Sequence, residues 1–135
     1  MSTRSTISIV DKKGTGRTNY CHWDGYLAHN GKILLTHYKT TKKVNQLIGL
    51  GDLSILNENI GKKVKFDGFD SGKTPQCLAY GRDRGEGVTF RLFSGKPTEE
   101  QEYDYLFENR KWYVRFGDTK NWRLLTKELI KANKD

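Results

Sequence analysis

Residues 20–26, Tyr-Cys-His-Trp-Asp-Gly-Tyr, form the densest group of chemically capable side chains in the chain. Side chains alternate between the two faces of a strand, so His22 and Asp24 are expected to share one face at the end of a strand over residues 17–23. A carboxylate beside an imidazole stabilises the protonated ring and fixes its tautomer, so this spacing predicts an acid–base or ligand-binding pair. The alternative is a half-buried, hydrogen-bonded His22 followed by Asp24 as a helix N-cap.

A second chemically capable segment, residues 80–87, reads Tyr-Gly-Arg-Asp-Arg-Gly-Glu-Gly. Glycines let a backbone approach a ligand closely, and the guanidinium forks of Arg82 and Arg84 match phosphate or carboxylate oxygens. The segment therefore predicts an anion-binding loop. The alternative is a solvated loop whose arginines pair with Asp83 and Glu86.

Together the two segments predict one anion site. Phosphate would be neutralised by the arginines, Tyr26 would stack on a base, and His22 and Asp24 would bond to sugar or base. A further charge would come from Arg4, which lies near the other strand of the first hairpin. The expected ligand-binding residues are Arg4, His22, Asp24, Tyr26, Arg82, Asp83, Arg84 and Glu86.

The common catalytic and cofactor motifs are missing from the sequence. There is no GxxxxGK[ST] loop, no Rossmann fingerprint, no GxSxG elbow, and no CxxC or HExxH. We therefore expect no metal site and no cofactor. If the protein is an enzyme, the candidate catalytic residues are His22 and Asp24.

Length and composition predict a single domain over residues 1–135, with a net charge of +8 that favours anionic partners. The alternative is that the scattered lysines and arginines only solubilise the surface. No apolar stretch approaches the roughly 20 residues that span a bilayer, and the N-terminus has no apolar signal region. We therefore expect a soluble, intracellular protein with Cys21 and Cys77 both reduced.

Hydrophobic periodicity predicts strands near both ends of the chain and helices between them. The expected strands are 6–10, 17–23, 64–69, 76–80, 88–93, 102–108, 111–116 and 121–126, and the expected helices are 27–38, a segment from about 41 to 49 or 51, and 127–134, with short helical turns over 53–60. This pattern predicts an α+β fold, with a mostly antiparallel sheet of about five to seven strands and two or three helices packed on one face. The other face is left to solvent or to a second copy in a homo-oligomer.

Aromatic and apolar residues at alternating positions predict which side chains form the core. In the second strand we expect Cys21 and Trp23 to point inward. In the hairpin over 102–116, the aromatic residues are expected to form the core; they are Tyr103, Tyr105, Trp112 and Tyr113. The alternative there is an exposed aromatic sheet that stacks RNA bases, but no RNP1-like sequence is present.

Several segments resemble a group of small, largely uncharacterised bacteriophage and prophage proteins. These are Thr3-Arg4-Ser5-Thr6-Ile7, the heptapeptide 20–26, Gly31-Lys32-Ile33-Leu34-Leu35-Thr36-His37-Tyr38, residues 80–86, and the hairpin with Tyr105-Leu106-Phe107 and Trp112-Tyr113-Val114. The resemblance implies a phage accessory protein of the bacterial host cytoplasm. By analogy, such proteins often counter host defences.

Three functions stay open at this point. The first is a binding protein for an anionic ligand, either a nucleotide-type signal or a nucleic-acid segment. The second is a protein–protein inhibitor whose basic surface binds an acidic host protein. The third is an enzyme of the phosphodiesterase or nuclease type, with His22 as acid or base.

Overall fold

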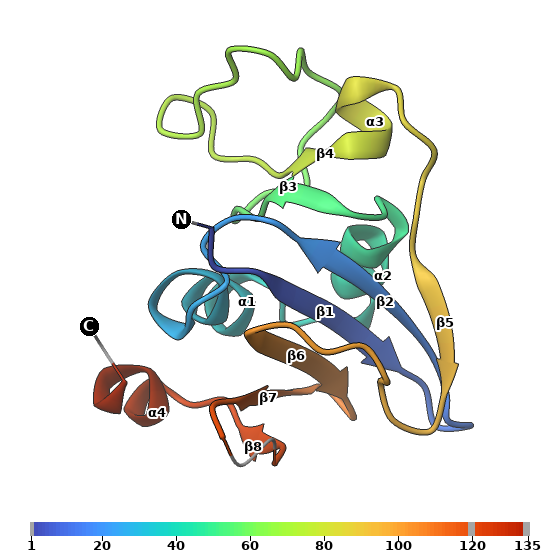
Figure 1. Cartoon of the computed structure of the whole chain (residues 1–135), viewed down its shortest axis with the longest axis vertical. Coiled ribbons are helices and arrows are strands. Elements are labelled where there is room, and N and C mark those ends of the chain that lie inside the picture. The colour runs from blue at the N-terminus through green and yellow to red at the C-terminus, as the bar shows by residue number, and fades with distance from the viewer. Residues whose placement is uncertain (1, 119–120, 134–135) are drawn as a thin grey trace.

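The structure, a computed structural model, describes residues 2–118 and 121–133 and is built around one mixed β-sheet (Figure 1). Its strands run in the order β4-β3-β2-β1-β6-β7-β8, and β5 pairs with the first half of β2. The strands are β1 (Ser5–Val10), β2 (Thr15–Cys21), β3 (Leu53–Ile55), β4 (Leu78–Ala79), β5 (Arg91–Ser94), β6 (Tyr103–Glu108), β7 (Lys111–Phe116) and β8 (Arg123–Leu124). The helices are η1 (Leu27–Gly31, a π-helical turn), α1 (Lys32–His37), α2 (Thr41–Gly49), α3 (Tyr80–Arg84) and α4 (Lys127–Ala132).

The α+β class predicted from the sequence is confirmed. Among the described strands five pairings are antiparallel, while β1–β6 and β2–β3 are parallel. The sheet has eight strands, more than the five to seven expected. Helices η1, α1 and α2 supply the core on one face, but α3 follows β4 directly at the edge of the sheet (Figure 1). The helices are therefore not all gathered on one face.

The hydrophobic core lies between one face of the sheet and the segment from η1 to α2. Parallel pairing of β1 with β6 sets Ile7 beside Tyr105 and Ile9 beside Phe107, so two aliphatic and two aromatic side chains point to the same side. Helix α2 is capped by the Thr40 hydroxyl, which accepts from the Lys43 amide. The helical side chains that complete this core are Leu27, Leu34, Tyr38, Val44, Leu47 and Ile48.

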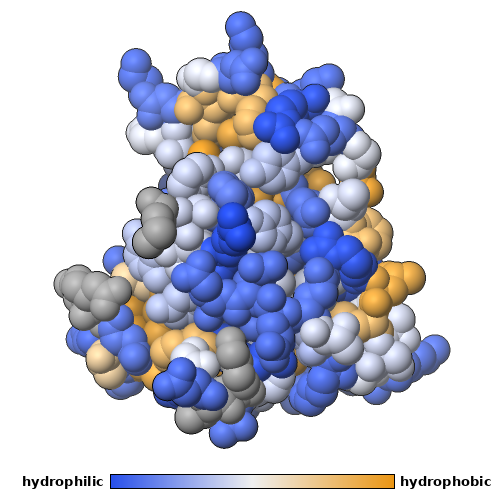
Figure 2. All heavy atoms as spheres, in the orientation of Figure 1, coloured by the Kyte–Doolittle hydropathy of each residue, from blue (hydrophilic) through white to orange (hydrophobic). Residues whose placement is uncertain are grey.

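The opposite face of the sheet is polar and largely covered. The segment that links β5 to β6 returns across the sheet (Figure 1), and hydrophilic residues dominate the middle of the face shown in Figure 2. Beneath it, the buried Asp104 carboxylate accepts from the Thr6 hydroxyl at 2.7 Å, from the Gln101 amide at 2.9 Å and from Arg115 at 3.3 Å. Burial raises the pKa of Asp104, and these donors oppose the shift.

Two predicted elements are wrong. Residues 53–55 form β3 rather than helical turns, because Leu53 pairs with Cys21 on one side and with Ala79 on the other. Residues 64–69 form no strand; the Val64 amide instead donates to Asp83. In both places, pairing with residues distant in sequence decides the backbone.

Two of the predicted strands are shorter than expected, and one helix was not predicted. Strand β5 begins only at Arg91, and β4 covers two residues of the predicted 76–80. Helix α3 occupies the segment predicted as a loop and ends at Gly85, whose φ of 75° is the left-handed conformation that glycine adopts easily. The last predicted helix, 127–134, is described as α4 to residue 132, and residue 134 lies outside the described range.

Candidate functional site

The heptapeptide 20–26 leaves the sheet earlier than expected. Strand β2 ends at Cys21, and Asp24 has a φ of 57°, a left-handed conformation that breaks strand alternation. As a result Cys21 is fully buried, as predicted, but Trp23 is 42% exposed and the prediction that it lies in the core is wrong. The exposed indole ring packs edge-on against the imidazole of His22, with ring centroids 4.7 Å apart.

His22 has a different partner from the one predicted. Its Nδ1 lies 2.8 Å from the hydroxyl of Tyr20, two residues earlier on the same face. Among the described residues, no hydrogen bond or ion pair joins His22 to Asp24. The backbone carbonyl of Asp24 accepts from Asn30, and the N-cap of η1 is Tyr26, so Asp24 is not that cap either. This geometry offers a tyrosine–histidine–tryptophan group, and no histidine–carboxylate pair for acid–base chemistry.

Gly25 sits where the turn after β2 touches the start of the chain. Its amide donates to Thr3 and its carbonyl accepts from the Tyr105 hydroxyl at 2.7 Å. A Cβ at this position would lie 2.8 Å from both the Thr3 carbonyl oxygen and the Ser5 Cβ. The turn therefore requires glycine for close approach.

Substitution of Gly25 by alanine is expected to lower the free energy of unfolding by about 1–3 kcal/mol, because backbone atoms must shift to admit the methyl group. Urea unfolding of G25A measures this. G49A is the matched control: its Cβ meets no atom within 4 Å, so it is expected to be neutral or slightly stabilising. Equal stability of G25A and wild type would show that the turn tolerates a side chain.

Arg82 and Asp83 are tied to the protein itself. The guanidinium of Arg82 donates to both carboxylate oxygens of Asp83, at 3.0 and 3.1 Å, and to the carbonyls of Ile60 and Cys77. The buried Asp83 also accepts from the amides of Val64 and Ala79. Burial alone would raise the pKa of Asp83, but the donors from Arg82, Ala79 and Val64 outweigh it and lower the pKa. These two residues hold the segment after β4 in place.

Arg84, in contrast, lies at the surface among aromatic rings. Its guanidinium carbon is 4.7 Å from the centroid of Phe66 and 4.6 Å from that of Tyr80, and the two rings stack on each other at 5.5 Å. It also donates to Glu86. About half of both charged side chains is exposed, so this pair is open to exchange with an outside anion.

The two segments do meet, through Asp52. Cys21, Leu53 and Ala79 are paired across β2, β3 and β4, so Tyr20, Asp52 and Tyr80 form the neighbouring row on the opposite face. The Asp52 carboxylate accepts from the Tyr20 amide at 2.9 Å, and its carbonyl accepts from the Tyr80 amide at 3.2 Å. With strands about 4.8 Å apart, the backbones of Tyr20 and Tyr80 are roughly 10 Å apart.

Arg4 joins the same face. Ser5 pairs with Cys21, so Arg4 lies opposite His22 in register. Burial raises the pKa of Tyr20, and the positive charge of Arg4 opposes this shift. Among the described residues the Arg4 guanidinium makes no hydrogen bond or ion pair.

We call this region the aromatic–arginine surface. It consists of Arg4, Tyr20, His22, Trp23, Phe66, Tyr80 and Arg84. Of the residues predicted for the site it brings together Arg4, His22 and Arg84. Tyr26 instead packs against His29 of η1, and Asp24 occupies the turn.

Four aromatic members of the surface were not predicted. Alternation does place Tyr20 beside His22, which is the one available sequence signal. Phe66 and Tyr80 fall within the predicted strands 64–69 and 76–80. In the structure Phe66 lies in an irregular segment and Tyr80 begins α3, so strand alternation does not give the direction of either side chain.

Among residues 2–118 and 121–133, no three histidine, cysteine or acidic side chains are grouped to hold a metal ion. Within the same ranges, no helix has the length and apolar character needed to cross a bilayer. Both thiols are free and buried, and burial raises the pKa of Cys21 to about 12, so it is no nucleophile at neutral pH.

Comparisons with known proteins identify no relative: no family model, no curated protein and no solved structure matches the chain. The resemblance to small phage proteins therefore stays a prediction.

Proposed function

We propose that the protein binds single-stranded nucleic acid on the aromatic–arginine surface. The observation that supports this most strongly is the grouping of partly exposed aromatic rings with arginines on one face. Aromatic rings stack on bases of any sequence, and arginines both stack and neutralise phosphate. Trp23 and Tyr80 would contact bases, while Arg4 and Arg84 would contact the backbone.

The shape of the surface favours a strand over a single nucleotide. Beside Arg84 a wide, open recess of about 570 Å³ is lined by Lys63, Lys65 and Phe66. Sites for small molecules are usually concave and enclose most of the ligand. An open face that carries cations and rings at intervals of several ångströms suits a polymer, whose phosphates and bases repeat.

The acidic residue at the centre of the surface does not oppose this function. The Asp52 carboxylate is bonded to Arg91 at 2.8 Å, to the Thr89 hydroxyl at 2.8 Å and to the Tyr20 amide. Arg91 also donates to Glu99 at 2.7 Å, so this guanidinium is shared by two carboxylates and offsets part of the charge of Asp52.

The recess is lined by three cations, Lys63, Lys65 and Arg84, and by two carboxylates, Asp67 and Asp83. Because Asp83 is paired with Arg82, the net charge of the recess is positive.

This proposal changes the roles first assigned to two residues. Arg82 and Asp83 support the surface by fixing α3, and Arg84 alone of the three would touch the ligand. We further propose that the protein acts as a phage accessory factor in the host cytoplasm, where a strand of host or phage nucleic acid is its partner.

Substitution of Trp23 by alanine is expected to weaken binding by about 1–3 kcal/mol, the contribution of one stacked base. Fluorescence anisotropy with labelled single-stranded DNA and RNA of about 12 nucleotides measures it. F90A is the control, because Phe90 is an exposed ring of similar accessibility outside the surface. If wild type does not bind either strand at low salt, the proposed function is wrong. If W23A binds as well as F90A, the surface is misplaced.

A further inference from the structure

Strand β5 leaves one edge of the sheet open. It pairs with the first half of β2 on one side, and among the described residues no strand pairs with it on the other. Figure 1 shows β5 at the outer margin of the sheet. An open edge presents unpaired backbone amides and carbonyls that can receive a further strand. The proposed function does not use this edge.

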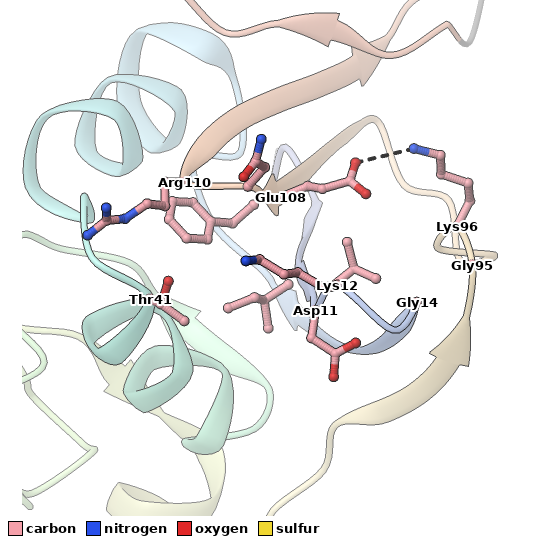
Figure 3. A pocket seen from close by; sticks show the side chains of 12 residues that line it. Asp11, Lys12, Gly14, Thr41, Gly95, Lys96, Glu108 and Arg110 are labelled. Atoms are coloured by element: carbon pink, nitrogen blue, oxygen red, sulfur yellow. Dashed lines mark hydrogen bonds and ion pairs between the residues drawn. The ribbon is translucent and has the colours of Figure 1, made fainter.

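The pairing with β2 fixes which backbone groups of β5 are free. At the end of the pairing the Gly95 amide donates to the Gly14 carbonyl at 2.7 Å, and Figure 3 shows the two glycines side by side. In an antiparallel pair, successive residues direct their backbone groups to opposite edges. Counted from Gly95, Phe93 and Arg91 therefore face β2. Leu92, between them, directs its amide and carbonyl outward.

Three exposed apolar side chains follow this edge. Val88, Phe90 and Leu92 are 57, 36 and 72% exposed. They make up three of the five large hydrophobic side chains that are exposed among the described residues, so the exposed apolar surface is concentrated here. In Figure 2 apolar residues are seen at the margin of the molecule where Figure 1 places β5. A contiguous row of this kind is typical of an interface, whereas single exposed apolar residues are common.

The three side chains share one face of the segment. Between them, Thr89 and Arg91 both donate to the Asp52 carboxylate at 2.8 Å, so these two side chains point to the polar face of the sheet. On the other side, the guanidinium carbon of Arg17 lies 5.0 Å from the centroid of the Phe90 ring, and Arg17 is bonded to α2. The apolar row therefore continues the face that α2 covers, beyond the reach of α2.

The charges along this edge are already paired. Within residues 87–95 the only charged side chain is Arg91, which is bonded to Asp52 and Glu99. The next charged residue, Lys96, turns to Glu108 at 3.4 Å (Figure 3). Natural proteins usually protect an open edge with a lysine, a proline or a bulge. None of these occurs in β5, whose pairing with β2 is regular.

From these features we propose that a second copy of the chain occupies the edge, with the two β5 segments antiparallel about a two-fold axis at Phe90. The backbone of Phe90, two residues from Leu92, also faces outward, so both residues can bond to the partner. In this register Val88 lies opposite the partner's Leu92, and the three apolar side chains of each copy gather on the α2 side. Thr89 lies opposite the partner's Arg91, so like charges do not meet. The edge is thus self-complementary, which favours a second copy over an unrelated strand.

The dimer is expected to be weak. A single pair of short strands buries little area, and interfaces below about 1,200 Å² in total are typical of transient association. The net charge of +8 on each copy also repels the other. Salt screens this repulsion, so dimerisation should strengthen as salt rises, whereas nucleic-acid binding should weaken. The two proposals therefore succeed or fail independently.

Sedimentation velocity of the whole protein at about 1 to 300 µM tests for the dimer. We expect a monomer at the low end of this range and an increasing share of dimer toward the high end. L92K places a lysine on the edge and should weaken dimerisation by about tenfold or more without loss of thermal stability, since Leu92 is exposed. L124K is the matched control, because Leu124 is an exposed leucine on β8. A monomer at every concentration, or a dimer that L92K weakens no more than L124K does, would overturn the proposal.

Disulfide trapping tests the register. Residues opposite each other in a hydrogen-bonded antiparallel pair have Cα atoms about 5.5 Å apart, which a disulfide can span. F90C should therefore form a disulfide-linked dimer under mild oxidation. L92C should not, because the two copies of residue 92 would lie roughly 13 Å apart along the strands. The native cysteines, Cys21 and Cys77, are buried and do not compete. Linkage of L92C in place of F90C would overturn the two-fold axis at Phe90.

Discussion

Replacement of Asp83 by alanine is expected to lower the free energy of unfolding by about 3–5 kcal/mol, the largest single effect on stability that we predict. The change leaves the Arg82 guanidinium without its bidentate partner, and it leaves the amides of Val64 and Ala79 without an acceptor. Loss of a buried partner is costly because the remaining charge and donors stay desolvated. Urea unfolding followed by circular dichroism measures the loss.

The control for D83A is E86A. Glu86 is about half exposed and, within the described ranges, its side chain pairs only with Arg84, so its removal is expected to change stability by less than about 1 kcal/mol. Because the pKa of Asp83 is lowered in the folded protein, its stabilising contribution is present above the unfolded pKa of about 3.9 and is lost as the pH falls through the folded pKa. A D83A protein as stable as E86A would show that this network does not hold α3.

Removal of four cations from the surface is expected to produce the largest loss of binding. The variant R4A/K63A/K65A/R84A eliminates up to four phosphate contacts, each of which contributes roughly 0.7 to the slope of log K against log salt for single strands. The slope should therefore fall by about 3, and affinity at roughly 0.1 M salt by several hundred-fold. Anisotropy titrations over a salt series measure both quantities.

A change of net charge alone must be separated from this effect. The control K42A/K111A/K127A/K131A also removes four positive charges, but from exposed positions elsewhere on the chain. It is expected to keep a salt slope close to that of wild type. Similar losses in the two variants would mean that the attraction is spread over the whole protein and that the aromatic–arginine surface has no special role.

Long strands in which apolar and polar side chains alternate were predictable from the sequence, because this pattern depends only on neighbouring residues. The hairpin of β6 and β7 shows this: of the four aromatic residues predicted in its core, Tyr105 and Trp112 are buried there. The other two, Tyr103 and Tyr113, are only half-buried. The spacing of Leu27, Leu34 and Tyr38 likewise predicted one continuous helical face, which η1 and α1 form.

The candidate site was less predictable because its parts depend on distant pairing. The left-handed backbone at Asp24 ends the alternation that would have buried Trp23. Strand β3 has only three residues and exists because β2 and β4 flank it, and it is β3 that brings Tyr20 and Tyr80 together. The pairing of Arg82 with Asp83 and of Arg84 with Glu86 was the alternative stated from the sequence, and the structure has both pairs. The bonds of Arg82 to the carbonyls of Ile60 and Cys77 could not be predicted from spacing.

The most direct test of nucleic-acid binding at this surface is to observe the three tryptophan indole N–H signals by ¹⁵N NMR while a single-stranded oligonucleotide is added. We expect the Trp23 signal to shift and broaden. Trp112 is 3% exposed and its indole donates to the Tyr38 carbonyl at 2.8 Å, so its signal should stay in place. Trp122, which lies under Arg115 away from the surface, should also be unaffected. An unchanged Trp23 signal at saturating oligonucleotide would contradict the proposed site.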